Sequence, residues 1–344
     1  MSESRQTSST ASLVDENRKR AIERAQQADR TRRLLQGAGI LIPFSLVLIY
    51  GMLCIPNFAS GSNVTNMLIN ASILAITAMG QTVVIAVFGL DLSVGAMQAL
   101  VVCVTALLVN GTNPLIGAVG GIVLGTMLGI LNGLVVVKLK VTDFIATLAT
   151  MNIFRGMALL ITAGAPIEIL SPHFKSIATR SFAGIPLTFV LALIIGAITW
   201  FVMERMPVGK HVVAVGDNAL SARDSGINVV GILLKGYAFC GMTAGIAGVL
   251  LASQLGTINA TVSTGLELQT IAVVVIGGTS MFGGHPRIVG TLLGSVLLTM
   301  IYSGLNILNI PSFYQYIALG VLLVFALSVD SAQRATVVRL FKGR

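Results

Sequence analysis

Charged residues are scarce in this sequence. Only 10% of its 344 residues are Asp, Glu, Lys or Arg, whereas 55% are hydrophobic and the mean hydropathy is +0.90. This composition excludes a soluble globular domain and indicates a chain that crosses a membrane many times. The formal net charge of +9 does not indicate a nucleic-acid partner, because the basic residues of membrane proteins collect in cytoplasmic loops.

Signatures of catalysis are also missing. No segment matches the phosphate-binding pattern G-x-x-x-x-G-K-[ST], and Gly209-Lys210 is followed by His211 without the upstream glycine. The three histidines lie far apart, and the three cysteines lie in apolar runs without metal-ligand spacing. We therefore expect no catalytic residue, metal site, cofactor or disulfide. Any energy from ATP must come through another subunit.

The first 36 residues are polar and basic, so they do not form a cleavable signal peptide. Two interpretations stay open for this tail: a solvated cytoplasmic segment, or a basic face that contacts anionic membrane lipid. A second basic tail is expected at 331–344.

A spanning helix needs roughly 20 apolar residues, and segments of this kind fill residues 37–330. We expect an all-α polytopic membrane protein whose transmembrane domain covers this range. The segments at 93–110, 142–162 and 267–281 are the least regular, because they are short or contain polar and glycine-rich breaks. The ten predicted spans are 37–55, 66–88, 93–110, 115–137, 142–162, 186–203, 229–252, 267–281, 287–306 and 313–330.

The distribution of Lys and Arg predicts the orientation. With ten spans and a cytoplasmic N-terminus, only Lys175 and Arg180 of the 22 basic residues fall in outer loops, and Arg155 falls within a span. All the others lie on the inner side, in loops, in tails or at the inner ends of spans. The positive-inside rule therefore favours ten spans with both termini in the cytoplasm.

Two patterns concern helix packing. Glycines recur every four residues from Gly117 to Gly133, which predicts a small-residue strip that allows a neighbouring helix to approach closely. A weaker pattern is a sequence similarity between the ends of the fourth and ninth spans, Asn132-Gly133-Leu134 and Ser303-Gly304-Leu305. These spans run in opposite directions in the ten-span arrangement, which favours two inverted five-helix halves.

Polar residues inside spans are costly and are candidates for function. Asp91 lies in the break between the second and third spans, where an N-cap is the structural interpretation. Arg155 is expected to pair with a carboxylate or with carbonyl groups, and Glu267 opens the eighth span. Amide side chains either line a path for a hydroxylated solute or bridge helices; these path candidates are Asn70, Gln81, Asn132 and Asn152.

The stretch 204–228 is the longest polar interruption between the two apolar halves. Pro207 and Gly209 are expected to stop the preceding helix. Asp217 or Asn218 can cap a short helix over 219–225, which Gly226 can end. Such a capped, charged helix is either a docking surface or an ordinary solvated loop.

Four ordered segments now resemble a known family, the membrane permease subunits of bacterial ABC importers for monosaccharides such as ribose, xylose, arabinose and galactose. The likeness covers roughly 40–330. The segments that carry it are 89–95 (Gly-Leu-Asp-Leu-Ser-Val-Gly), 147–156 (Thr-Leu-Ala-Thr-Met-Asn-Ile-Phe-Arg-Gly), 209–228, and 265–291 with its Gly277-Gly278-Thr279 and Gly283-Gly284.

The resemblance implies a bacterial inner-membrane protein with three kinds of partner: a cytoplasmic ABC ATPase, a periplasmic sugar-binding protein and a second permease subunit, identical or paralogous. It also implies that the loop around Gly216 to Gly226 docks on the ATPase. We expect Ala219 and Ala222 to allow close approach and Arg223 to supply a charged contact. The expected coupling residues are Gly216, Asp217, Asn218, Ala219, Ala222, Arg223 and Gly226.

This sequence departs from the family pattern at three positions. Asp217 stands where a second glycine is common, Asp224 where an apolar or aromatic residue is common, and Gln269 where an acidic residue is frequent. Alternatives to a monosaccharide are a nucleoside, a polyol or a furanose signal carried by the same ABC mechanism. An ion-coupled secondary transporter is a further alternative, although one lone arginine and no chain of buried carboxylates argue against a proton relay.

Overall fold

The computed structural model describes residues 40–182 and 184–342, with side chains described up to residue 328. The predicted tail at 1–36 lies outside the described residues. The elements are a helix at Ile40–Cys54, α2 (Gly61–Ala86), α3 (Val94–Gly111), α4 (Pro114–Lys138), α5 (Asp143–Thr162), β1 (Ile167–Glu168), α6 (Pro172–Lys175), β2 (Ser181–Phe182), β3 (Ile185–Pro186), α7 (Leu187–Arg205), α8 (Pro207–Asp217), α9 (Ala219–Asp224), α10 (Val229–Leu255), β4 (Thr257–Ile258), α11 (Leu266–Ile276), α12 (Ile288–Ile307) and α13 (Ser312–Lys342).

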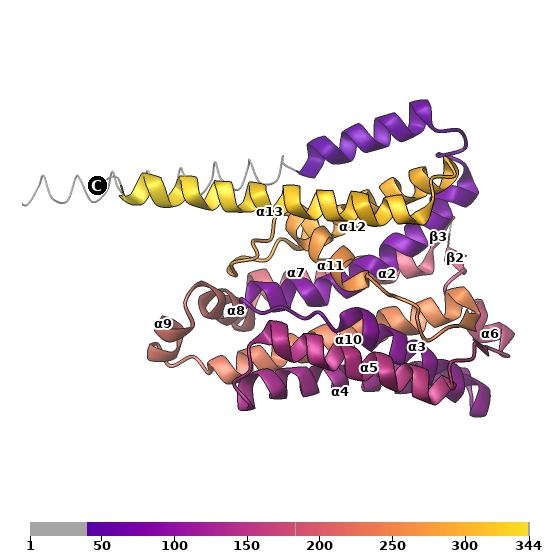
Figure 1. Ribbon diagram of the computed structural model, residues 1–344, viewed down its shortest axis with the longest axis horizontal. Coiled ribbons are helices and arrows are strands. Elements are labelled where there is room, and N and C mark those ends of the chain that lie inside the picture. The colour runs from indigo at the N-terminus through magenta and orange to yellow at the C-terminus, as the bar shows by residue number, and fades with distance from the viewer. Residues whose placement is uncertain (1–39, 183, 343–344) are drawn as a thin grey trace, which may run out of the picture.

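The long helices lie along a common direction and form a bundle (Figure 1). Helices α8 and α9 lie at one end of the bundle, which we call the α9 end. Helix α6 and the short strands β2 and β3 lie at the opposite end, the α6 end. The strands are minor elements, since β1 pairs antiparallel with β4 and β2 pairs antiparallel with β3 over two residues each.

Seven of the described helices are long and apolar enough to cross a membrane: α2, α3, α4, α5, α7, α10 and α12. These match seven of the ten predicted spans, including the irregular ones at 93–110 and 142–162. The other three predicted spans correspond to shorter apolar helices, Ile40–Cys54, Leu266–Ile276 and Ser312–Ser328. Ten crossings therefore stay a prediction.

The predicted span at 267–281 extends five residues beyond the end of the observed helix α11, which is Leu266–Ile276. Helix α11 has 11 residues, which rise about 16 Å at the usual helical pitch, against a hydrocarbon core of about 30 Å. It ends at Ile276 because Gly277 packs against the backbone of Gly290 and Gly278 adopts a positive φ of 90°. At the C-terminus, α13 continues helically to Lys342, through most of the expected tail at 331–344.

Helix α2 is the centre of the bundle. Every residue from Ala71 to Ala86 is buried, and the helix packs against α7, α10, α11 and α12. By contrast, α4, α5 and α7 expose many large apolar side chains, among them Met127, Ile153 and Phe201. A helix buried all round belongs to a bundle interior, whereas exposed apolar faces suit a lipid or subunit contact.

The predicted glycine strip on α4 is confirmed as a packing surface. Gly125 and Gly129 face Gly245 and Gly241 of α10, so that the backbones of the two helices touch. A Cβ on Gly241 would lie 2.7 Å from the Cα of Gly129 and would collide with the carbonyl oxygen of Gly125. The strip holds α4 against α10 without any ligand, through close backbone packing.

Replacing Gly241 with alanine tests this packing. Because the added methyl group meets rigid backbone rather than a mobile side chain, Gly241→Ala should lower stability by about 1–3 kcal/mol, as overpacked cores do. Thermal unfolding of the detergent-purified protein measures the loss. The matched control is Gly156→Ala on α5, where an added Cβ meets no atom within 4 Å. Equal melting temperatures for the two variants would contradict the account.

Candidate functional site

The stretch 204–228 forms two helices rather than a loop. Helix α7 ends at Arg205, and Pro207 occupies the first turn of α8, where its missing N–H and fixed φ are favourable. The expectation that Pro207 stops the preceding helix is confirmed. The same expectation for Gly209 is wrong, because this glycine lies inside α8 and allows the new helix to pass close to the backbone of Met203.

Helix α9 has the predicted caps. The side chain of Asn218 accepts a hydrogen bond from the backbone N–H of Ser221 at 3.0 Å, and Gly226 follows the helix with a φ of 82°. The helix covers Ala219–Asp224, one residue shorter than expected. Helix α9 projects from the α9 end of the bundle (Figure 1).

The two faces of α9 differ. Ala219, Leu220 and Arg223 point to solvent, and Leu220 is 74% exposed. Ala222 is only 4% exposed and packs in a cluster with Met79 of α2 and other apolar residues. The close approach to an ATPase that we expected of Ala222 is therefore not available on this surface. Leu220, which the sequence analysis did not single out, is the large apolar side chain on the outward face.

Gly216 joins this region to the centre of the bundle. A Cβ at Gly216 would collide with the carbonyl oxygen of Ala86, the last residue of α2, and would lie 2.7 Å from the backbone nitrogen of Gly284. The N–H of Gly284 itself donates to Ala86 O at 3.0 Å. Three backbones therefore meet here: the end of α8, the end of α2 and the segment between α11 and α12. We call this contact the glycine junction.

The two acidic residues that depart from the family pattern are both exposed. Asp217 follows the glycine junction, and a Cβ on Gly284 would lie 2.7 Å from its Oδ1 atom. Asp224 ends α9 on the solvent side. Asp217 also lines a cavity of about 480 Å³ at the α9 end, together with Asn218, Ala219, Asp143 and Phe282.

Asp91 lies at the same end in a buried hydrogen-bond network. Its Oδ1 atom accepts from the N–H of Ser93 at 2.8 Å and from the Ser93 hydroxyl at 2.7 Å, and Asn132 donates to its Oδ2 atom at 3.2 Å. The N-cap of α3 is Ser93 rather than Asp91, which corrects the expected cap by two residues. Burial raises the pKa of the Asp91 carboxyl, and the hydrogen bonds from Ser93 and Asn132 act in the opposite direction.

The four amide residues predicted to line a solute path occupy four different environments. Asn132 is fully buried and fastens α4 to the start of α3. Gln81 is also fully buried, where its Oε1 atom lies 3.9 Å from the Cys240 sulfur. Asn152 lies exposed on α5 and donates to the carbonyl of Leu148 in its own helix. Asn70 alone lines a cavity, at the α6 end, and accepts a hydrogen bond there from Gln254 at 2.8 Å.

Arg155 satisfies its guanidinium with carbonyl groups. It donates from α5 to Ala260 O and Val262 O, both at 2.9 Å, and so holds the segment between α10 and α11. This matches one of the two expected pairings. Glu267 lies in the first turn of α11, where its carboxylate meets Gly95 of α3 so closely that a side chain at 95 has no room.

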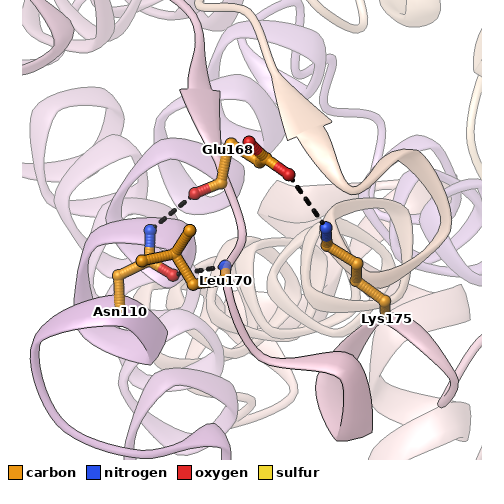
Figure 2. Close-up of polar contacts among 4 residues, drawn as sticks. All are labelled: Asn110, Glu168, Leu170 and Lys175. Atoms are coloured by element: carbon orange, nitrogen blue, oxygen red, sulfur yellow. Dashed lines mark hydrogen bonds and ion pairs between the residues drawn. The ribbon is translucent and has the colours of Figure 1, made fainter.

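The α6 end carries a hydrogen-bonded surface layer. Asn110, at the end of α3, donates to Glu168 O at 2.7 Å and accepts from the N–H of Leu170 at 2.8 Å, so it holds the chain where β1 ends (Figure 2). Lys175 pairs with Glu168 at 3.3 Å, with both side chains partly exposed. An exposed pair of this kind adds little stability. The layer is also held by the pairing of β1 with β4 and by the buried Ser253 hydroxyl, which donates to Phe174 O of α6 at 2.6 Å.

Known proteins resemble this chain over most of its length. A family model described as "Branched-chain amino acid transport system / permease component" matches residues 63–327. The ribose import permease protein of Haemophilus influenzae is 36% identical over 87% of this chain and 94% of its own length. The ribose import permease protein of Bacillus subtilis is 38% identical over 85% and 91%, and the D-allose transport system permease protein of Escherichia coli is 37% identical over 83% and 88%. No solved structure matches.

Two asparagines allow a paired test of the buried network. Asn132→Ala removes the donor that satisfies Asp91 and Ser93, so it should lower stability by about 1–3 kcal/mol, the usual penalty for a buried polar partner left unpaired. Asn152→Ala on exposed α5 is the control and should change stability by less than about 0.5 kcal/mol. Thermal unfolding of both purified variants measures the loss of stability in each. A larger loss for Asn152→Ala would contradict the assigned contacts.

Proposed function

This chain belongs to the family of permease subunits of bacterial ABC importers for monosaccharides, and from that premise we propose that it carries a monosaccharide from a periplasmic binding protein to the cytoplasm. A separate ATPase subunit drives the transport by switching the permease between outward and inward access. The chain is a multi-pass protein of the inner membrane, in keeping with its relatives and its apolar helices.

The outward face of α9 is the observation that carries the coupling proposal. It offers an exposed apolar side chain, Leu220, beside the charged Arg223 on a short capped helix. An apolar anchor next to an arginine is typical of interface hot spots. Through the glycine junction, a displacement of this region would move the end of α2 directly, because backbone contacts leave no flexible side chain to absorb it.

The pattern of helix packing supports two inverted halves. Helices α2, α3, α4 and α5 correspond in order to α10, α11, α12 and α13. Helix α4 packs on α10 and α3, and its counterpart α12 packs on α2 and α11. Helix α3 packs on α5 and α10, and its counterpart α11 packs on α13 and α2. Exchanging α2–α5 with α10–α13 in order therefore maps each of these contacts onto another. The segment just before α3, Gly89-Leu90-Asp91-Leu92, also matches the segment at the start of α11, Gly265-Leu266-Glu267-Leu268. We infer that the α9 end lies in the cytoplasm, because the positive-inside rule assigns most basic residues to that side.

The proposed partners occupy opposite ends. The ATPase subunit docks on α9. The periplasmic sugar-binding protein docks on the α6 end, where Asn110 holds the end of β1 and Ser253 holds α6. A second permease subunit, identical or paralogous, completes the membrane part. The exposed apolar faces of α4, α5 and α7 supply surface for it and for lipid.

A charge on the outward face of α9 should break the ATPase contact. Leu220→Glu replaces the apolar anchor with a carboxylate, and loss of a hot-spot side chain removes about 2 kcal/mol or more. Affinity for the co-expressed ATPase should fall at least about tenfold, measured by co-purification. The control is Leu170→Glu, the same change at a leucine that is 69% exposed at the α6 end. If both variants retain the ATPase equally, α9 is not the docking site.

The energy source separates this proposal from an ion-coupled carrier. Uptake of D-ribose or D-allose by cells that express the complete importer should stop when ATP is depleted and should persist when ionophores collapse the ion gradients while ATP is held constant. An empty-vector strain gives the background. The reverse result, uptake that survives ATP depletion and is abolished by ionophores, would favour the secondary carrier and overturn the ABC mechanism.

A further inference from the structure

A second cavity, of about 620 Å³, lies at the α6 end between α2, α3, α10, α11, α12 and the start of α13. This size falls within the range of about 300–1,000 Å³ that is usual for small-molecule sites. Its lining comes from both proposed halves of the chain. We call it the amide cavity because of the side chains that line it.

The polar lining of the amide cavity is uncharged. Six amide side chains line it from α2, α3, α10 and α11 and two more from α12 and α13, and none of the described lining residues is Asp, Glu, Lys or Arg. Hydroxyl groups and apolar side chains such as Tyr302 and Leu251 complete it. The amide residues are Asn63, Asn66, Asn70, Gln98, Gln254, Gln269, Asn306 and Gln315.

Bridging between helices accounts for some of these amides. Gln254 donates to Asn70 at 2.8 Å, and Ser263 donates to Gln98 at 2.6 Å. Ser303 donates to Asn63 at 2.8 Å and Gln315 donates to Asn306 at 2.7 Å. Bridging does not account for three amides. Within the described part of the chain, the side chains of Asn66 and Gln269 make no hydrogen bond, and the Oε1 atom of Gln254 is buried without a partner. A buried polar atom without a partner costs free energy, so a ligand or water is needed to satisfy it.

We propose that the amide cavity is a solute-binding subsite of the permease for a neutral, polyhydroxylated molecule, and that Asn66, Gln254 and Gln269 hydrogen-bond its hydroxyl groups. The proposal rests on the proposed function. An amide offers two N–H donors and a carbonyl acceptor, and a sugar hydroxyl both donates and accepts. Tyr302, Leu251 and Leu266 give apolar surface for the C–H faces of a sugar ring.

The absence of charge in this lining also sets the substrate class. The family model is described by branched-chain amino acid transport, and an amino acid carries both an ammonium and a carboxylate group. Burying these groups without charged or strongly hydrogen-bonding partners is costly. A lining of neutral amides therefore accepts a sugar and disfavours an amino acid.

Helix α2 connects this cavity with the core. Asn63, Asn66, Asn70, Thr77 and Gln81 follow one another at spacings of three, four, seven and four residues, which places them on one face of a helix with 3.6 residues per turn. Gln98 of α3 donates to Thr77 at 3.3 Å, one step deeper than the cavity. Gln81, the last of the series, is buried with its Nε2 atom unpartnered. The polar series thus continues from the cavity toward the α9 end.

Protection of an introduced cysteine tests the subsite. Met67→Cys, at a residue that lines the cavity but is not assigned a hydrogen bond to the solute, is made in a Cys54→Ala background, because Cys54 is the exposed native thiol whereas Cys103 and Cys240 are buried. In membranes that hold the permease with its ATPase but no binding protein, a membrane-impermeant thiol reagent should label Cys at 67. D-Ribose or D-allose should slow labelling in proportion to the occupied sites, about tenfold near ten times the dissociation constant. Leucine should not.

Thr179→Cys, on the exposed surface of the α6 end outside the cavity, is the matched control and should label at the same rate with or without sugar. Sugar uptake by the complete importer is measured in parallel. Uptake without protection at 67, or no labelling at 67, overturns the subsite and leaves the proposed function intact. Protection by leucine instead of sugar overturns the substrate class. If neither sugar is taken up nor protects, the proposed function and the subsite fail together.

Discussion

The glycine junction is the constraint on which the rest of the arrangement depends. Gly216 and Gly284 have no side chains, so the end of α8 and the segment before α12 can both reach the carbonyl of Ala86 at the end of α2. Contacts between backbones are stiff, since neither partner has rotamers to change. Helix α2 packs on α7, α10, α11 and α12. A displacement of α8 and α9 would therefore be transmitted through α2 to most of the bundle.

A second constraint is the fastening of the segments that interrupt the apolar helices. Backbone and charged groups at these breaks must find partners inside the protein. Asp91 finds them in Ser93 and Asn132 at the α9 end, and Arg155 finds them in the carbonyls of Ala260 and Val262 at the other end. Each cluster ties a helix break to a helix from elsewhere in the same half or in the other half. The charged residues of the motifs thus hold the breaks in shape.

Local patterns predicted much of this fold. The glycine spacing on α4 predicted a close helix contact, and Asn218 and Gly226 predicted the caps of α9, because these signals depend on residues a few positions apart. The predictions failed where distant residues decide. At α11 a local stop signal is present, since Gly278 follows the helix with a positive φ, but the sequence near it does not show that Gly277 will pack against the backbone of Gly290. Likewise, the burial of Ala222, which leaves Leu220 on the outward face of α9, depends on a cluster of apolar residues from α2, α7, α8, α10 and α12.

The same distinction explains the path candidates. Asn70, Gln81, Asn132 and Asn152 look alike in the sequence, as amides within apolar runs. Only the fold separates an amide at a cavity from one that fastens Asp91 or faces outward on α5. The spacing of Asn63, Asn66 and Asn70 on one face of α2 was a usable signal, and it required knowing that this face meets α10, α11 and α12 rather than lipid.

The chemistry of α2 fits an import mechanism driven from outside the chain. One end of this helix carries amides into the amide cavity, and the other end is held in the glycine junction beside α8 and α9. Neutral amides bind no proton or metal ion strongly, so the series along α2 offers no strong binding site for a coupling ion. In the mechanism proposed above, movement of the solute would follow from movement of the helix itself. The backbone contacts of the glycine junction, between α2 and the region of α8 and α9, would supply the mechanical connection that this mechanism requires.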